Sequence, residues 1–467
     1  MASLAGMLQQ IGYNVTGSDH AAYPPMSDFL AKLGIKVMQP YSETNLSARP
    51  DIVVVGNAIS RGNVELEYVL DERIPFRSLP QVLQENFLRT REPLVIAGTH
   101  GKTTTTSMLA WIFESAGLNP SFLIGGIAEN FGSSFAVTEG THFIIEGDEY
   151  DTAFFDKGPK FLHYLPASVL LTHVEFDHAD IYEDLDAVKT AFKRLVNLVP
   201  RRGHIIAYDA SANVSECVSK AFCPVETYGF SEQATWRAVD LKFGPEKTTW
   251  SVLHNRKQWA DFEFPIAGSY NVLNATGAAA LASKYGISPE AVASALKSFK
   301  SVKRRLEVKA EIGGITIIDD FAHHPTAIRE TLQALRARYP QRKLWAIFEP
   351  RSNTLRRKVF QNELVESLRV ADEIVMASVF KAEGVPLDER LESSTVINGL
   401  QAANLPAREL ADADAIVAAV TPELKRGDVV AILSNGGFDG IYEKLPRHLR
   451  KILGETPAEK SEVAAQS

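Results

Sequence analysis

A lysine and two threonines end a glycine turn in the run Gly98-Thr99-His100-Gly101-Lys102-Thr103-Thr104. The apolar residues Leu94 to Ala97 before the turn predict a buried strand, and Met108 to Ala116 after it predict a helix. Strand, glycine turn and helix in this order form a phosphate cradle, because the first turn of a helix presents unpaired amides and a positive dipole end to an anion. The sequence therefore predicts a nucleotide-phosphate site.

The side chains of this run suit a nucleoside triphosphate with its metal ion. Lys102 is expected to reach the β- and γ-phosphates, and the hydroxyl of Thr103 is expected to bind Mg²⁺. The general phosphate-loop spacing is not met, since Ile96 stands five residues before Gly101. A glycine turn without function is the alternative. We expect Lys102→Ala to stop catalysis and leave stability unchanged, because we place the lysine on a surface loop.

Two further strands lead into groups that could hold a metal ion. The strand Phe143 to Ile145 precedes Glu146-Gly147-Asp148-Glu149-Tyr150-Asp151, and the strand Ser168 to Thr172 precedes His178. Ligands bind beyond the carboxyl ends of strands in open α/β sheets, and Mg²⁺ prefers oxygen ligands. Taken alone, the acids could form a solvated loop and the histidine could be a satisfied polar residue. Together with Lys102 they favour a metal site.

The first 90 residues alternate helical and extended segments, which is typical of an α/β fold with a parallel sheet. Helices are predicted at Leu4 to Ile11 and Met26 to Leu33, an extended segment at Tyr13 to Val15, and a buried strand at Asp51 to Val55. A dinucleotide-type fold normally opens with a strand and a glycine-rich turn. We expect this chain to lack both, through either a wrongly assigned first codon or a truncated start.

The length of 467 residues predicts about three domains. We expect domains at 1–90, 91–302 and 303–453, and a loose polar tail at 454–467. The third domain is expected to begin near Arg304 and to contain a strand, Ile315 to Ile318, that leads to Asp319 and Asp320.

Composition limits the partners and the compartment. A net charge of -8 and a pI near 5.8 argue against a nucleic-acid partner, which usually requires a basic surface. No apolar run approaches the roughly 20 residues that cross a bilayer, and the start does not resemble a signal peptide. Cys217 and Cys223 match neither a zinc site nor a disulfide framework. We therefore expect a cytoplasmic protein without a membrane partner.

Six ordered segments resemble the successive motifs of the Mur ligases. They are the run at 98–104, Glu146-Gly147-Asp148-Glu149, Glu175-Phe176-Asp177-His178, Gly268-Ser269-Tyr270-Asn271-Val272-Leu273-Asn274, Arg304-Arg305-Leu306-Glu307 and Asp319-Asp320-Phe321-Ala322-His323-His324-Pro325. The resemblance covers nearly the whole chain. It implies an α/β protein with three domains: a Rossmann-like N-terminal domain that lacks its first strand, a central phosphate-loop ATPase domain and a Rossmann-like C-terminal domain.

The resemblance also implies roles for individual residues. The ATP-binding residues would be Gly98, Thr99, His100, Gly101, Lys102, Thr103, Thr104, Asn271, Arg305 and Asp320. Thr103, Glu146 and His178 would bind the magnesium ion, and Asn271 would face adenine. Arg305 and Asp320 would approach ATP from the third domain, so that the site would be complete only when this domain closes. The chain departs from the family pattern at Gly147, His173 and Tyr270.

Two late segments indicate the substrates. Glu349-Pro350-Arg351-Ser352-Asn353-Thr354 and Ser434-Asn435-Gly436-Gly437-Phe438-Asp439-Gly440 resemble the family members that attach L-alanyl-γ-D-glutamyl-meso-diaminopimelate to UDP-N-acetylmuramate in peptidoglycan recycling. The expected substrate-binding residues are Ser18, Asp19, Asn57, Arg351, Asn353, Ser434 and Asn435. The planar fork of Arg351 suits a carboxylate of the tripeptide, although an ordinary surface arginine is an alternative.

The expected reaction joins a carboxylate to an amine through an acyl phosphate. Lys102 and Mg²⁺ would neutralise the phosphoryl group while the carboxylate attacks it, and Lys102, Glu146 and His178 would be catalytic. His323 or His324 could accept the proton of the amine, since histidine titrates near neutrality. The alternative for this pair is structural, because Pro325 fixes a turn that a neighbouring histidine can cap.

Two other functions stay open from the sequence. A related ligase that adds free L-alanine to UDP-N-acetylmuramate would share the ATP site and differ in its amine substrate. An ATP-regulated protein that binds a muramyl nucleotide without turnover would be consistent with the missing first loop. The sequence does not predict an oligomeric state.

Overall fold

The structure is a computed structural model that describes residues 1–22, 26–244 and 246–454. Residues 455–467, nearly all of the predicted tail, lie outside the described residues. The chain forms two compact units. The first unit comprises residues 1–242, 247–266 and 270–303, and the second is formed mainly by the chain from Arg304 onward. Within the described residues, no helix is both long enough and apolar enough to cross a membrane.

The N-terminal part of the first unit contains two small parallel sheets. One pairs β1 (Thr16–Ser18) with β2 (Lys36–Met38), and the other pairs β3 (Val53–Val55) with β4 (Phe76–Ser78). Its helices are α1 (Ala2–Gln10), α2 (Met26–Lys32), α3 (Val64–Asp71) and α4 (Leu79–Leu83). The alternation of helices and parallel strands agrees with the predicted α/β class.

The extended segment predicted at Tyr13 to Val15 is wrong in position, because β1 begins only at Thr16. The reason is the end of α1. The amide of Gly12 donates to the carbonyl of Gln9, and the amide of Tyr13 donates to the carbonyl of Leu8. These residues therefore close the helix and cannot pair with another strand.

A ten-stranded sheet forms the centre of the first unit, in the order β16-β15-β14-β13-β12-β11-β5-β8-β6-β7. Its central, parallel strands are β5 (Glu92–Ala97), β6 (Ser121–Ala128), β8 (His142–Gly147), β11 (Ser168–Leu171), β12 (His204–Tyr208) and β13 (Val225–Gly229). The outer strands are β7 (Ser133–Ala136), β14 (Trp236–Phe243), β15 (Thr248–His254) and β16 (Lys257–Phe264). A separate antiparallel pair joins β9 (Asp151–Ala153) to β10 (Asp156–Pro159).

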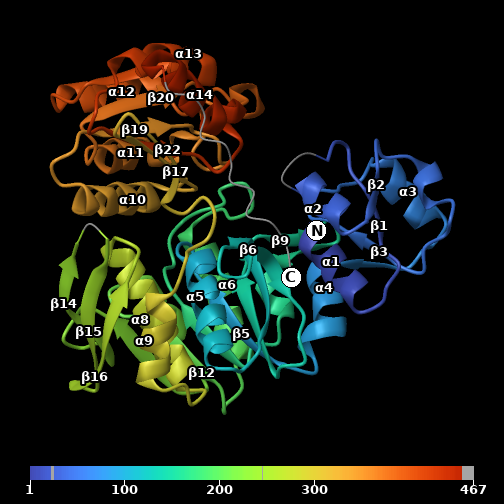
Figure 1. Ribbon diagram of the computed structural model, residues 1–467. Coiled ribbons are helices and arrows are strands. Elements are labelled where there is room, and N and C mark those ends of the chain that lie inside the picture. The colour runs from blue at the N-terminus through green and yellow to red at the C-terminus, as the bar shows by residue number, and fades with distance from the viewer. Residues whose placement is uncertain (23–25, 245, 455–467) are drawn as a thin grey trace. The chain divides into compact units, whose positions relative to one another are not determined.

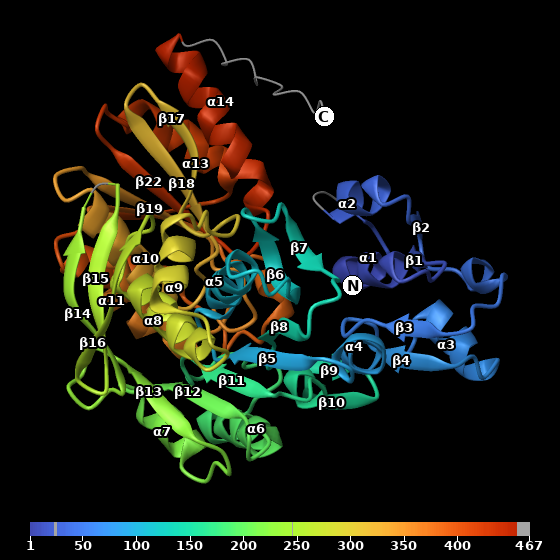
Figure 2. The same ribbon diagram turned by 60° about the horizontal axis from the view of Figure 1, so that its bottom comes forward.

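Helices cover both faces of this sheet, as Figure 2 shows. The helices α5 (Lys102–Ser115), α8 (Ser269–Ser283) and α9 (Pro289–Lys297) lie on one face, and α6 (Leu185–Leu198) and α7 (Ala212–Val218) lie on the other. Residues 94–97 are fully buried, since a parallel strand covered on both faces needs apolar side chains throughout. The carboxyl ends of β5, β8 and β11 meet at one edge of the sheet.

The second unit is built on a six-stranded sheet in the order β17-β18-β22-β19-β20-β21. Its strands are β17 (Glu307–Ile312), β18 (Ile315–Asp320), β19 (Leu344–Phe348), β20 (Glu373–Ala377), β21 (Ala407–Leu410) and β22 (Val429–Leu433). All neighbours are parallel except β17, which pairs antiparallel with β18.

Two apolar clusters hold helices against the two faces of this sheet (Figure 1). One cluster includes side chains of α10 (Pro325–Arg338), α11 (Gln361–Leu368) and α12 (Ser393–Ala402). The other includes side chains of α13 (Ala413–Val420) and α14 (Ile441–Leu453). As in the first unit, strand ends and the loops after them converge at one edge.

Candidate active site

The glycine turn after β5 is tied to the segment that follows β11. At Gly98, φ is +134°, and a Cβ atom would lie 2.1 Å from the hydroxyl of Thr172. The amide and the hydroxyl of Thr99 both donate to the carbonyl of His173, at 2.8 Å and 3.0 Å. Only glycine allows both this backbone conformation and this close approach. The turn is therefore held in place from two strands before α5 begins at Lys102.

Lys102 does not lie on a surface loop, and this expectation was wrong. Its side chain is 14% exposed, and its Nζ donates to the carbonyls of Gly98 (2.6 Å) and Thr99 (3.3 Å) and to Oε1 of Glu149 (2.8 Å). Burial alone would lower the pKa of Lys102, but the charges of Glu149, Glu146 and Asp148 raise it overall. The lysine thus carries its charge within a pocket of carbonyl and carboxylate oxygens.

Thr103 and Glu146 are in direct contact. The hydroxyl of Thr103 donates to Oε1 of Glu146 at 2.9 Å, and Oε2 of Glu146 accepts from the amide of Gly125 at 2.8 Å. Glu146 is the penultimate residue of β8, and Thr103 is in the first turn of α5. The structure therefore brings together two of the three residues that the sequence predicted to bind metal.

His178, the third of these residues, reaches the same group through Glu149. Its Nε2 lies 3.3 Å from Oε1 of Glu149, and its backbone is left-handed, with φ at +55°. Burial would lower the pKa of His178, but the hydrogen bond to Glu149 and the charge of Asp177 raise it overall. The ring packs edge-on against Tyr150, with centroids 5.0 Å apart.

Glu149 is the site residue that the sequence reasoning did not single out. Its side chain is 1% exposed, one carboxylate oxygen contacts both Lys102 and His178, and the other oxygen is buried with no hydrogen-bond partner among the described residues. The hydroxyl of Tyr182 donates to its carbonyl at 2.6 Å. The available signal was the recurrence of glutamate three residues after Glu146, just beyond the end of the strand.

Asn271 and His100 occupy defined positions near the turn. Asn271 is 2% exposed in the first turn of α8, and Nε2 of His100 lies 3.1 Å from a carboxylate oxygen of Glu175. A Cβ at Gly101 would lie 2.7 Å from the amide oxygen of Asn274, one turn further along α8. Thus α8 and the phosphate turn are adjacent. The roles predicted for Asn271 and for Thr104, which is buried in α5, stay predictions.

In the second unit, Asp320 anchors the loop after β18. Its carboxylate accepts from the amides of Leu306 (2.8 Å) and Ala322 (2.9 Å) and from the hydroxyl of Thr331 (3.1 Å). Burial raises the pKa of Asp320, although Arg305 and these hydrogen bonds oppose the effect. The guanidinium of Arg305 lies over the ring of Phe321, 5.1 Å from its centroid. The approach of Arg305 and Asp320 to ATP stays a prediction.

The two histidines of this loop differ in their contacts. His324 is 5% exposed and caps α10, since its Nδ1 accepts from the amide of Thr326 at 3.3 Å. This is the structural alternative that the sequence left open for the pair. Nδ1 of His323 lies 2.9 Å from the carbonyl of Phe321. If His323 carries its proton on Nδ1, Nε2 has the lone pair that a proton acceptor needs.

The predicted substrate residues of the second unit gather at the ends of β19 and β22. Nη1 of Arg351 lies 3.3 Å from Oε1 of Glu349, and the hydroxyl of Ser434 donates to Oε2 of Glu349 at 2.5 Å. Glu349 is 4% exposed. The amide oxygen of Asn435 is buried without a hydrogen-bond partner among the described residues. Asn353 is turned toward Arg356, from which its side-chain oxygen accepts at 2.6 Å.

Ser18, Asp19 and Asn57 lie in the N-terminal part of the first unit. Ser18 and Asp19 stand at the carboxyl end of β1, and Asn57 follows β3 by two residues. These strands belong to different two-stranded sheets. The position beyond strand ends agrees with the general place of ligands in α/β folds, and the binding role of the three residues stays a prediction.

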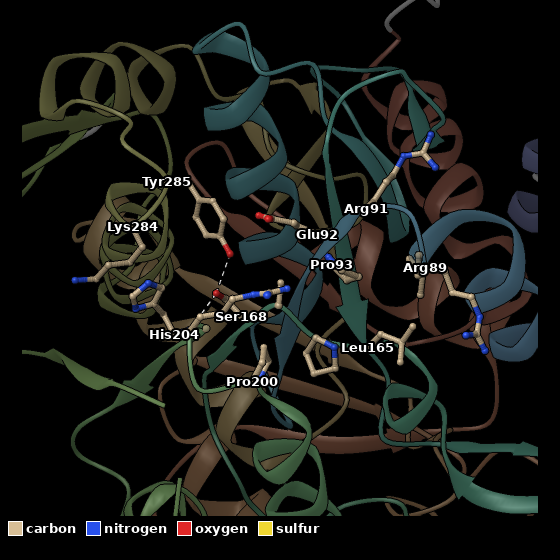
Figure 3. A pocket seen from close by; sticks show the side chains of 15 residues that line it. Arg89, Arg91, Glu92, Pro93, Leu165, Ser168, Pro200, His204, Lys284 and Tyr285 are labelled. Atoms are coloured by element: carbon tan, nitrogen blue, oxygen red, sulfur yellow. Dashed lines mark hydrogen bonds between the residues drawn. The ribbon is translucent and has the colours of Figure 1, made fainter. Parts of the chain in front are cut away.

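A cavity of about 470 Å³ lies at the opposite edge of the central sheet, where β5, β11 and β12 begin. Figure 3 shows the hydroxyls of Ser168 and Tyr285 in its wall, joined by a hydrogen bond of 2.8 Å. None of the predicted site residues lines this cavity. Its walls are formed by the amino ends of strands, and so it is separate from the phosphate turn.

The chain matches three protein families along its length. Residues 1–91 match the Mur ligase family catalytic domain, residues 96–282 the Mur ligase middle domain, and residues 304–436 the glutamate ligase domain of Mur ligases. These matches follow one another in the order expected from the sequence motifs.

Individual relatives match almost end to end. UDP-N-acetylmuramate–L-alanyl-γ-D-glutamyl-meso-2,6-diaminoheptandioate ligase of Escherichia coli is 40% identical, over 97% of this chain and 96% of its own length. UDP-N-acetylmuramate–L-alanine ligase of Acidithiobacillus ferrooxidans is 31% identical, over 98% and 96%. The crystal structure of a murein peptide ligase from Psychrobacter arcticus is 36% identical, covers 96% of each chain and superposes with a TM-score of 0.72.

A phosphate turn on a parallel sheet, with buried acids and a histidine beside it, defines a nucleotide-dependent α/β enzyme. The matches are more specific: the chain belongs to the Mur ligase family, whose members are ATP-dependent ligases. The predicted family and the three-domain α/β class are confirmed. The exact domain boundaries and the roles of single residues stay predictions.

Proposed function

We propose that this chain joins the carboxylate of UDP-N-acetylmuramate to the amine of L-alanyl-γ-D-glutamyl-meso-diaminopimelate, with ATP cleaved to ADP and phosphate. The observation that carries the proposal is the phosphate turn with Lys102 held by Glu149 beside Glu146 and His178. The choice of the tripeptide is supported by the 40% identity to the Escherichia coli ligase named for it, against 31% to a ligase named for L-alanine.

The proposed reaction has two steps that balance. A carboxylate oxygen attacks the γ-phosphorus, the bond to the β-γ bridging oxygen breaks, and ADP leaves. The peptide amine then attacks the carbonyl carbon of the acyl phosphate, loses a proton and expels phosphate. Lys102 supplies a positive charge where two anions must approach, and the amides at the start of α5 point to the same place. His323 is our candidate to accept the proton of the amine.

The residues at the phosphate turn fit a magnesium ion. They offer a hydroxyl and a carboxylate already in contact, Thr103 and Glu146, together with the imidazole of His178. The buried oxygen of Glu149 that has no hydrogen-bond partner among the described residues is a further hard donor of the kind that Mg²⁺ prefers. Bound there, the ion would neutralise the charge of the phosphates.

For the amine substrate, Arg351 is the proposed carboxylate contact. Its guanidinium lies 3.7 Å from the ring centroid of Phe380, and a Cβ at Gly436 would fall 2.0 Å from its Nε. The guanidinium plane of Arg351 is therefore held between the ring of Phe380 and the backbone of Gly436, which has no side chain. Among the described residues only Nη1 has a hydrogen-bond partner, Glu349, which leaves the other nitrogens able to bind a substrate carboxylate.

The deciding experiment offers the amine substrates in competition. The protein is incubated with ATP, Mg²⁺, UDP-N-acetylmuramate and equal concentrations of the tripeptide and L-alanine, and the products are measured by mass spectrometry. We expect the tripeptide product to dominate. A clear preference for L-alanine would contradict the tripeptide assignment and keep the ligase chemistry, whereas ATP-bound protein without either product would contradict the proposed turnover.

A further inference from the structure

Arg304, where the long segment of the second unit begins, contacts three separate segments of that unit. Its Nε lies 3.1 Å from a carboxylate oxygen of Asp319 at the end of β18. Its Nη2 donates to the carbonyl of Ser434 after β22 at 2.8 Å, and to the hydroxyl of Tyr442 in α14 at 2.6 Å. Asp319 is 2% exposed and Arg304 28% exposed in their side chains, so the pair is largely sheltered from water.

The backbone of Arg304 is also held in an unusual conformation. Its φ is +63°, a left-handed value that costs energy for a residue with a side chain. Its amide donates to Oε2 of Glu307 at 2.7 Å, and its carbonyl accepts from the amide of Phe321 at 2.9 Å. The surroundings thus fix both the main chain and the side chain of this residue.

These contacts continue to the proposed carboxylate site at Arg351. Ser434, whose carbonyl Arg304 holds, donates its hydroxyl to Glu349, and Glu349 binds Arg351. A second route runs through Tyr442, whose hydroxyl also contacts the carbonyl of Gly436 at 3.4 Å. Gly436 packs against the guanidinium of Arg351. Arg304 therefore fixes the loop 434–436 from both sides, without itself contacting Arg351.

We propose that Arg304 is a positioning residue for the amine substrate, acting through the loop 434–436 on Arg351. This inference rests on the proposed function, in which Arg351 binds a carboxylate of the tripeptide. Arginine is required for this role because one guanidinium must reach a carboxylate, a carbonyl and a hydroxyl at once. An ammonium could keep the charge near Asp319, but it could not reproduce all three contacts.

The test is a double-variant cycle on the full chain, with KM for the tripeptide, KM for ATP, kcat and thermal stability measured for each variant. Arg304→Lys is expected to raise the tripeptide KM by about tenfold, the effect of a lost charged hydrogen bond. Arg351→Lys is expected to do the same. The variant with both changes should have a tripeptide KM close to that of the more severe single variant, because the two residues act in one chain of contacts.

Arg342→Lys is the matched control. Arg342 also makes several contacts inside the second unit, donating to the carbonyls of Gly427 (2.6 Å) and Asp428 (2.8 Å) and to the hydroxyl of Thr316 (2.9 Å). It lies before β19, away from the loop 434–436, so its replacement should lower stability and leave the tripeptide KM unchanged. Equal effects of Arg304→Lys and Arg342→Lys on this KM would overturn the inference.

Two further outcomes separate this inference from the proposed function. If the single effects multiply in the variant with both changes, Arg304 does not act through Arg351, and only the inference fails. An unchanged tripeptide KM in Arg351→Lys would contradict the proposed carboxylate contact and the inference together. If Arg304→Lys does not fold, Tyr442→Phe removes only the hydroxyl between Arg304 and Gly436. We expect it to raise the tripeptide KM a few-fold, and no change would overturn the inference.

Discussion

Each unit of the molecule contains a buried glutamate that contacts a basic side chain, Lys102 in the first and Arg351 in the second, and the two pairs differ in what they leave available. In the first unit, Glu149 is 1% exposed and Lys102 14%, and Nζ lies 2.8 Å from the carboxylate. In the second unit, Glu349 is 4% exposed and Arg351 27%, and Nη1 lies 3.3 Å from the carboxylate. The first pair is more buried and closer.

The difference follows from the shape of the two cations. The ammonium of Lys102 is surrounded by two carbonyls and one carboxylate, so it must give up some of these contacts to reach a phosphate. The fork of Arg351 meets Glu349 through one nitrogen and can bind a substrate through the others. The ammonium of Lys102 thus has to leave some of its partners to bind a phosphate. The planar guanidinium of Arg351 can contact Glu349 and a substrate carboxylate at once.

The largest effect is expected from breaking the first pair. Lys102→Ala removes the charge that faces the phosphates and should lower kcat by a hundredfold or more, as measured by release of phosphate. It also removes the ammonium that lies 2.8 Å from the buried carboxylate of Glu149, which should destabilise the first unit by about 3 kcal/mol, as measured by urea unfolding. The structure thus changes the earlier expectation that stability would not move.

Two companion variants sharpen this comparison. Adding Glu149→Gln to Lys102→Ala removes the uncompensated charge, so stability should recover while activity does not. Arg351→Ala in the second unit should cost less stability, about 1–2 kcal/mol, because Glu349 keeps the hydroxyl of Ser434. A Lys102→Ala protein that retains activity within about tenfold, or about 1.4 kcal/mol on the barrier, would rule out the assigned role of the lysine.

A smaller effect is expected from the proposed metal ligands. Glu146→Gln and His178→Ala should each raise the Mg²⁺ concentration for half-maximal rate by about 10–100-fold, because the first removes a carboxylate charge and the second an imidazole donor from the same group of side chains. Binding of Mn²⁺ followed by electron paramagnetic resonance provides a readout that does not depend on turnover. Unchanged Mg²⁺ and Mn²⁺ titrations in both variants would contradict the proposed metal site beside Thr103. Glu349→Gln, far along the chain, is the matched control.

The placements of side chains that could be predicted from the sequence depend on local requirements. A glycine with φ of +134° and a close neighbour must be glycine, and a strand that leads into acids places them at a sheet edge whatever follows. The turn at Gly98, the contact of Thr103 with Glu146 and the place of His178 beside them belong to this class.

The parts that were missed or wrong depend on contacts between distant segments. The partner of Lys102 stands 47 residues later, and Ser434 stands 130 residues after Arg304. No local pattern records such a pair, so a lysine that is buried by a remote glutamate could be mistaken for one on a surface loop. The shifted strand β1 has a different cause, since the closing hydrogen bonds of α1 use the amides of Gly12 and Tyr13.

Two histidines after β11 differ in the contacts of their rings, and their pKa values shift in opposite directions. Glu149 raises the pKa of His178, whereas His173 has a pKa of about 4, lowered first by burial and then by the charge of His100. Nδ1 of His173 is buried without a hydrogen-bond partner among the described residues, and its ring packs 4.6 Å from that of Tyr208. His173 therefore stays neutral where His178 is favoured as a cation.

The smallest effect on the reaction is expected at His173, where stability instead of activity should respond to pH. In the unfolded chain His173 binds a proton below about pH 6.5, but in the folded protein it does so only below about pH 4. Between these values the unfolded state binds the extra proton, so the free energy of unfolding should fall as the pH is lowered, by roughly 3 kcal/mol in total. Above about pH 7 His173 is neutral in both states, and its protonation no longer makes the free energy of unfolding depend on pH. His173→Asn, which replaces the imidazole with an amide that does not titrate, should remove this part of the pH dependence and leave the magnesium titration unchanged. The measurement is the urea midpoint of both proteins from pH 4 to pH 8, so that all other titrating groups cancel in the difference. If the difference is constant with pH, His173 is protonated equally in both states, and its ring is hydrated instead of enclosed between His100 and Tyr208.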